Sequence, residues 1–275
     1  FGLPRRAWRL LAQAEQRARA MGSHLVLMDL LPFAAHVAAR LGRFDDAHRL
    51  ADEMEDLQAR RKLPDSPAHL ASMRATIALE EGRAGLAVRL LTPLAATVDE
   101  SIAIGERLSL LTGLATALLA EGRPKAALRH TSAATALHRQ KGLGWINKMQ
   151  PPSVWWQHSR ALAACGRNDE AWAALQQARA FLMERVREMR DEGLRRSSLN
   201  KDSIHREIVL AWLEQAAVRG LPEAERLAHL RLPSELGESF QRLVDTGLRL
   251  NEIRDAAELE HFVVDELTEL SGADR

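Results

Sequence analysis

The chain has 275 residues, with 38 Lys or Arg against 37 Asp or Glu, so it carries almost no net charge. A balanced charge creates no general field toward polyanions, which argues against nucleic acid as a partner. Ala, Leu, Arg and Glu dominate, Tyr is absent and no long stretch alternates apolar and polar residues, so the composition predicts an all-α fold.

Cysteine content and hydropathy bear on the compartment. The single cysteine, Cys165, excludes an intramolecular disulfide framework and is typical of the reducing cytoplasm. The most apolar stretch, residues 24–37, is broken by Asp29 and Pro32 and is too short to span a bilayer. These features predict a cytoplasmic protein that does not insert into a membrane.

One short pattern recurs along the chain: a glycine, four further residues and an alanine. Successive copies are 40, 40, 40 and 44 residues apart, and they begin at Gly2, Gly42, Gly82, Gly122 and Gly166. The pattern predicts helix–turn–helix units, in which the glycine takes a left-handed conformation after the first helix and the alanine packs closely against that helix. Such units must stack to bury their apolar faces, so we expect an all-α solenoid with a C-terminal helical extension.

Helix boundaries follow from local signals taken in chain order. Pro67 after Ser66 predicts the start of a helix that runs to residue 81, and the pair Pro151 and Pro152 predicts another that runs to 165. A long helix is expected from Asp169 to about residue 192, followed by a polar hinge over 195–201. A closing helix is expected from about residue 203 to 218.

The turn pattern resembles that of the tetratricopeptide (TPR) family, whose units read Leu-Gly, aromatic, Gly-x-aromatic-x-x-Ala. The run from Leu41 to Ala47 matches best, with Phe44 in the aromatic position. Later copies keep the Gly and Ala but have Ala84, Pro124 and Asn168 at the aromatic position, and the period exceeds the usual 34 residues. The resemblance covers residues 1–219 and implies a scaffold that binds a partner.

No pattern of catalytic or metal-binding residues is present. The sequence lacks a phosphate-binding loop, a dinucleotide-binding glycine motif and a nucleophile elbow, and its ten histidines include no His-Glu-x-x-His. Cys165 directly precedes Gly166 at a predicted helix end, where a small, partly buried apolar residue fits. We therefore expect no catalytic residue, no metal and no cofactor, and conclude that the chain is not an enzyme.

In TPR arrays the first helices of successive units line a concave groove, so the resemblance places a binding site there. Four residues lie six positions before the turn glycines and should form a row in the groove: His36, Thr76, Thr116 and Arg160. Neighbouring positions on the same face complete the predicted site: Arg40, Met73, Thr112, Trp156 and Gln157, with Asp29 beside them. This mixed strip suits a peptide or a small polar ligand, with Arg160 beside Trp156 able to hold a carboxylate. The alternative is an ordinary solvated inner face.

The C-terminal part has a different character. Asp255 and Glu258 form a capping box, and one helical face then carries Leu259, Phe262, Val263, Leu267 and Leu270. The segment resembles the opening of a GAF sensor domain, with a linker over 220–235 and then a linker helix and the first GAF helix over 236–275. Both ends of the chain look cut from a longer protein. The apolar face is therefore expected to be covered by a second copy of the chain, in a dimer through residues 236–275, or to fold back onto the array.

In the family that this order resembles, a TPR array precedes GAF and an output domain, such as a histidine kinase, a nucleotide cyclase or a transcription activator. The resemblance implies a non-catalytic TPR module of a bacterial signalling or transcription-regulating protein that senses a partner and relays its presence to GAF and output domains. The alternative is a structural spacer or oligomerisation scaffold within the same kind of protein.

Overall fold

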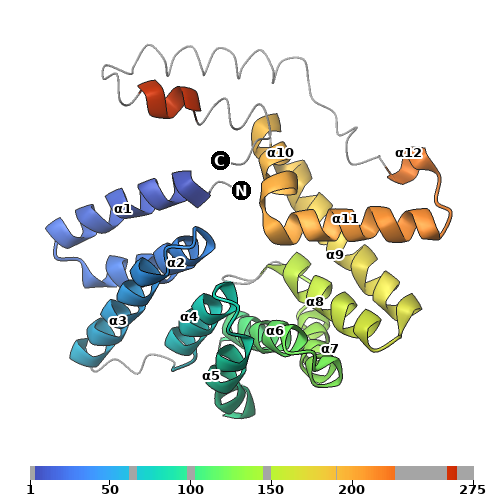
Figure 1. Ribbon diagram of the computed structural model, residues 1–275, viewed down its shortest axis with the longest axis horizontal. Helices are drawn as coiled ribbons and strands as arrows, with labels where there is room; N and C mark the ends of the chain where they lie inside the picture. The colour runs from blue at the N-terminus through green and yellow to red at the C-terminus, as the bar shows by residue number, and fades with distance from the viewer. Residues whose placement is uncertain are drawn as a thin grey trace. The chain divides into compact units, whose positions relative to one another are not determined.

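The computed structural model describes residues 4–61, 67–97, 103–144, 150–189, 191–226 and 259–264, and this part of the chain contains helices and turns but no β-strand (Figure 1). The predicted all-α fold is confirmed. The helices are α1 Pro4–Ala20, α2 His24–Arg40, α3 Phe44–Arg61, α4 Pro67–Glu80, α5 Ala84–Thr97, α6 Ile104–Ala120, α7 Pro124–Gln140, α8 Pro151–Ala164, α9 Asn168–Glu188, α10 Glu192–Lys201, α11 Ser203–Val218 and α12 Glu223–Arg226.

The predicted turns occur where the repeat pattern places them. Gly42, Gly82, Gly122 and Gly166 all have a left-handed backbone, with φ between 71° and 77°. At each, the residue after the glycine donates its N–H to the carbonyl five positions back, as Arg123 does to Leu118 at 2.9 Å. This bond and the one from the glycine itself satisfy carbonyls that the ending helix leaves unpaired. Gly2 lies outside the described residues.

Three further turns have the same geometry without the alanine of the pattern. Gly22 follows α1, Gly142 follows α7 and Gly220 follows α11, each with positive φ and the same pair of backbone hydrogen bonds. Gly142 ends the second helix of the pair α6 and α7, a place to which the pattern of Gly and Ala does not extend.

The repeat alanines are buried, as the pattern predicts. Ala47, Ala87 and Ala127 are fully inaccessible to solvent, and Ala171 is 6% exposed. The first three lie on helices that pack as pairs: α2 packs against α3, α4 against α5, and α6 against α7. Ala127, for example, belongs to a core cluster with Leu114 and Leu118 of α6. A side chain without atoms beyond Cβ lets the two backbones approach closely at these positions.

The chain divides into two compact units, of which the first is Pro4–Ala174 and the second begins at Leu175, within α9. In the second unit the guanidinium of Arg179 lies 3.7 Å from the centre of the Trp212 ring, which joins α9 to the closing helix α11. Trp212 is buried, in agreement with the packing role that its place on the closing helix suggests.

The prediction of a polar hinge over residues 195–201 is wrong, because these residues form most of α10. The side chain of Asp191 caps this helix by accepting a hydrogen bond from the N–H of Leu194 at 2.8 Å. Arg195 is buried and donates from Nε to the carbonyl of Met189 at 2.8 Å, and Ser198 is buried beside His205. A run of polar residues that are hydrogen-bonded inside the structure can therefore be mistaken for a loop when only the sequence is read.

Little of the C-terminal prediction falls on described residues. The expected linker over 220–235 includes the short helix α12, and its residues 227–235 lie outside the described segments. Residues 259–264 are helical, with Leu259 and Val263 exposed. The remainder of 236–275, including Leu267 and Leu270, lies outside the described residues. None of the helices that the structure describes is long and apolar enough to cross a membrane.

Candidate partner-binding face

The first helices of the helix pairs form a continuous layer within Pro4–Ala174. Helix α2 packs against α4, α4 against α6, and α6 against α8. Each second helix packs instead against first helices: α3 against α2 and α4, α5 against α4 and α6, α7 against α6 and α8. In the described residues no comparable packing joins α3, α5 and α7 to one another. Helices that contact one another lie closer together than helices that do not, so the layer of first helices is shorter than the layer of second helices. We therefore infer that the first helices line the inner side of a curved array.

Positions 13, 9, 6 and 2 before each turn glycine share one face of these helices, because residues four, seven and eleven apart align on an α-helix. The row at position 6 is the predicted one. Its outer members, His36 on α2 and Arg160 on α8, are exposed, while Thr76 on α4 and Thr116 on α6 are half-buried between them. The row therefore ends on α8 with a long, charged side chain, whereas the side chains in its middle are short.

The two threonines of this row already use their hydroxyl protons. Thr76 Oγ1 donates to the carbonyl of Ser72, and Thr116 Oγ1 donates to that of Thr112, each at 2.9 Å. Both oxygens keep lone pairs that can accept a hydrogen bond from a ligand. Thr112 itself is buried, and its hydroxyl has no hydrogen-bond partner among the described residues.

Helix α8 supplies the strongest polar group. The guanidinium of Arg160 lies 5.9 Å from the centre of the Trp156 ring and donates to Gln157 Oε1 at 3.2 Å. Trp156 and Gln157 are only 8% and 4% exposed. The two buried side chains therefore support and orient Arg160, which is the member of this group that a ligand can reach.

The nine predicted site residues fall into two groups by accessibility. Five are exposed or half-buried: His36, Arg40, Thr76, Thr116 and Arg160. Four are buried: Met73, Thr112, Trp156 and Gln157. A ligand could therefore reach the first group, whereas the second group is covered by the fold.

Apolar residues of α2 were missed by the sequence analysis. Phe33 is 61% exposed and Leu25 is 63% exposed, and both lie on the same side of α2 as Asp29 and His36. Phe33 stands nine positions before Gly42, the register of Met73 and Gln157. The repeat register would therefore have found Phe33, had that row been extended to the first helix pair.

A buried cluster of aromatic and histidine side chains joins α7 to α8. Trp155 Nε1 donates to His138 Nδ1 at 3.0 Å, so Nε2 of the neutral ring carries the proton that bonds the Gly144 carbonyl, also at 3.0 Å. His158 lies edge-on to Trp155 and bonds Thr131 Oγ1 at 3.0 Å. Burial, with Arg139 and Arg167 nearby, lowers the pKa of His158 to about 4. No three His, Cys, Asp or Glu side chains in the described residues are grouped so that they could hold a metal ion.

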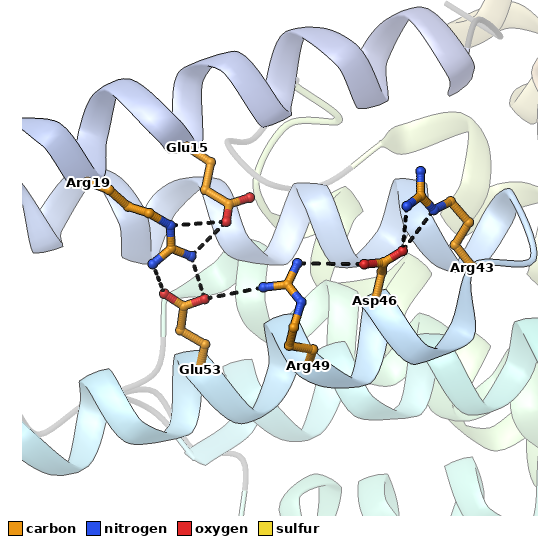
Figure 2. Close-up of polar contacts among 6 residues, drawn as sticks. All are labelled: Glu15, Arg19, Arg43, Asp46, Arg49 and Glu53. Carbon is orange, nitrogen blue, oxygen red and sulfur yellow. Dashed lines mark hydrogen bonds and ion pairs between the residues drawn. The ribbon is translucent and has the colours of Figure 1, made fainter.

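A second polar cluster links α1 to α3, as Figure 2 shows. Arg19 of α1 pairs at 2.6 Å with Glu15 on its own helix and with Glu53 on α3, and both carboxylates raise the pKa of Arg19. Arg49 continues the cluster from Glu53 to Asp46, at 3.8 and 3.7 Å. Beside it lies a cavity of about 320 Å³ with a lining of mixed charge: Arg19, Gly22, His24, Leu27, Glu53, Asp56, Leu57 and Arg60. The cluster thus fastens α1 to α3.

The sequence matches no protein-family model, and no curated protein is similar to it at the level of sequence. The structure is similar to that of BtubC (BKLC) from P. vanneervenii, with a TM-score of 0.50 and 14% identity, covering 80% of this chain and 93% of BtubC. A putative kinesin light chain from Podosopora anserina, with nearly identical TPR-like repeats, gives a TM-score of 0.41 and 19% identity, covering 67% and 97% of the two chains. The likeness to BtubC concerns the fold alone, which is an all-α helical solenoid.

Proposed function

We propose that the chain is a non-catalytic module that binds a protein or peptide partner on the inner face of α2, α4, α6 and α8. The observation that supports this most directly is the side-by-side packing of these four helices, each of which carries one of His36, Thr76, Thr116 and Arg160 at the same distance before its turn glycine. Packed helices are about 8–10 Å apart, so a row across four of them is about 25–30 Å long. An extended peptide of about eight or nine residues spans that length.

The side chains of the row suit such a peptide. Short threonines in the middle leave room for a backbone, and their oxygens can accept its N–H groups. Arg160, oriented by Trp156 and Gln157, offers a planar donor to a carboxylate at one end. A small polar ligand would use the same arginine but only a section of the row.

The test is peptide selection followed by a blocking substitution. Random nine-residue peptides displayed on phage would be selected on the intact chain, and the winners measured by fluorescence anisotropy. Thr116→Trp fills the middle of the row and should weaken binding at least tenfold. Thr92→Trp is the matched control, because Thr92 is an exposed threonine on α5 whose hydroxyl also donates to its own helix, at 2.7 Å to Val88.

Equal binding by Thr116→Trp and Thr92→Trp would contradict the assignment of this face. A selection that yields no binding peptide would favour the spacer or oligomerisation scaffold instead. We further propose that occupancy is relayed to a following GAF domain and output domain in a cytoplasmic bacterial signalling protein. That proposal is supported by the sequence resemblance of residues 236–275, and it is tested by whether a selected peptide changes the output activity of the full-length parent protein.

A further inference from the structure

Charge is distributed very unevenly along the chain, although the total is nearly balanced. From Gly122 to Asn168 the sequence contains no Asp or Glu at all. The same stretch contains eight cationic residues: Arg123, Lys125, Arg129, Arg139, Lys141, Lys148, Arg160 and Arg167. It includes all of α7 and α8, so these two consecutive helices carry cationic side chains and no acidic ones.

Three of these cations lie on one exposed stripe of α7. The stripe consists of a first member and the residues four, seven, eleven and fourteen positions after it, all of them exposed: Lys125, Arg129, Ser132, Ala136 and Arg139. Such positions align along one side of an α-helix, over about 21 Å at 1.5 Å per residue. We call this surface the α7 stripe.

The cations of the stripe have no carboxylate partners among the residues that the structure describes. Arg123 and Arg167, at either side in the sequence, pair with Glu121 and Glu170, which lie just outside the acid-free stretch. Arg139 instead lies 4.7 Å from the centre of the buried Trp155 ring. Stacking on that ring holds the guanidinium in place and leaves its N–H groups for a ligand.

Two histidines nearby respond to the resulting field. The pKa of His130 is lowered by burial and by Arg129. Arg139 is also among the causes that lower the pKa of His158, after burial. Burial is the larger cause at both histidines, and the neighbouring arginines add to it.

The equivalent stripe of α3 has the opposite charge. Counted from their turn glycines, the five positions of the α7 stripe correspond on α3 to Asp45, Arg49, Asp52, Asp56 and Ala59, all exposed. Neither helix type nor repeat register therefore requires a cationic surface here. The charge of the α7 stripe is therefore a property of α7 and not of the repeat.

We propose that the α7 stripe is a second docking surface, separate from the inner face, for an acidic helical segment of a partner protein. The charge selects an anion, and the small Ser132 and Ala136 in the middle let a partner backbone lie close. Nucleic acid fits less well, because no exposed aromatic side chain on the stripe could stack on a base. A membrane surface fits less well too, because the stripe presents no large apolar side chain for insertion.

The test uses the intact chain and a fluorescein-labelled 20-residue helical peptide of Glu and Ala, with a Gln-for-Glu peptide as its uncharged control. We expect the Glu peptide to bind at 50 mM NaCl and to weaken as salt rises, since exposed charges are screened. Lys125→Glu combined with Arg129→Glu should weaken binding more than tenfold. Arg89→Glu is the matched control, because Arg89 is the exposed residue of α5 at the register of Arg129.

Several outcomes would overturn the proposal. These are no binding of the Glu peptide at low salt, equal binding by the double variant, or tighter binding of duplex DNA or phosphatidylserine vesicles than of the peptide. Self-association of the chain that the double variant abolishes would assign the stripe to a second copy instead. Arg160→Ala and Thr116→Trp should leave peptide binding to the stripe unchanged, which separates failure here from failure of the inner-face proposal.

Discussion

Replacing Ala127 by Leu tests the close approach of the two helices in a pair. Ala127 is fully buried where α7 meets α6, and it shares a core cluster with Leu114 and Leu118. Leu adds three carbon atoms where no space is open, and forcing added carbons into a packed core costs about 1–3 kcal/mol. For a chain of this size that loss lowers the melting temperature by about 2–12 °C.

The control for this experiment is Ala133→Leu on the same helix. Ala133 is exposed, and Leu has nearly the same helix propensity as Ala, so its effect on the unfolding free energy should stay within about 0.5 kcal/mol. Thermal unfolding followed by circular dichroism at 222 nm, with urea unfolding as a second measure, compares the variants. If Ala127→Leu melts with the wild type and with Ala133→Leu, the close helix contact inferred from the repeat pattern is refuted.

Four further substitutions test the turns and the buried histidines. Gly122→Ala should lower the unfolding free energy by about 1 kcal/mol, because φ is 71° at this position. Gly113→Ala within α6 should instead raise it by about 0.5–1 kcal/mol, since the new Cβ meets Leu91 at an ordinary 3.5 Å. Urea unfolding distinguishes the two signs. His138→Phe leaves the buried Trp155 N–H unpaired and should cost about 1–3 kcal/mol with a shift in tryptophan emission, and unchanged stability and emission would contradict the assigned hydrogen bond. Because the pKa of His158 falls from 6.5 to about 4 on folding, the unfolded chain binds the extra proton between these values, so stability is lost as pH falls from 6.5 toward 4. The loss attributable to this partly exposed group is about 1–2 kcal/mol, and His158→Gln should flatten the pH profile by that amount.

The repeat turns could be predicted from sequence because their physics is local. A left-handed backbone favours glycine, and a close helix contact favours alanine. Gly122 and Ala127 therefore predict a turn and a buried residue, and the rest of the fold need not be known. The turns at Gly142 and Gly220 use the same glycine geometry, but no alanine five positions later marks them. The helix α10 was missed because its buried polar residues are satisfied by Asp191, Met189 and His205, which only the fold brings together.

For the candidate site, the helix on which each residue lies could be predicted from the sequence, but not how far each side chain is buried. Counting from the turn glycines placed Trp156 and Gln157 on the correct helix, whereas their burial depends on what packs over α8, which helix periodicity does not reveal. The Arg19–Glu53 pair was equally hidden, because it joins residues 34 positions apart on helices of different pairs. Phe33 was within reach of the sequence, because it shares the register of Met73.

The packing order of the first compact unit has a consequence for how it unfolds. Within Pro4–Ala174 the substantial helix contacts in the described residues join helices that are adjacent or next but one along the chain. The stability of this unit then comes mainly from contacts between neighbouring helices rather than from one central core. Short sequence separation between contacts also favours rapid folding. A tether pulled from the N-terminal end should therefore release these helices pair by pair, in a sawtooth of small force steps instead of a single cooperative rupture.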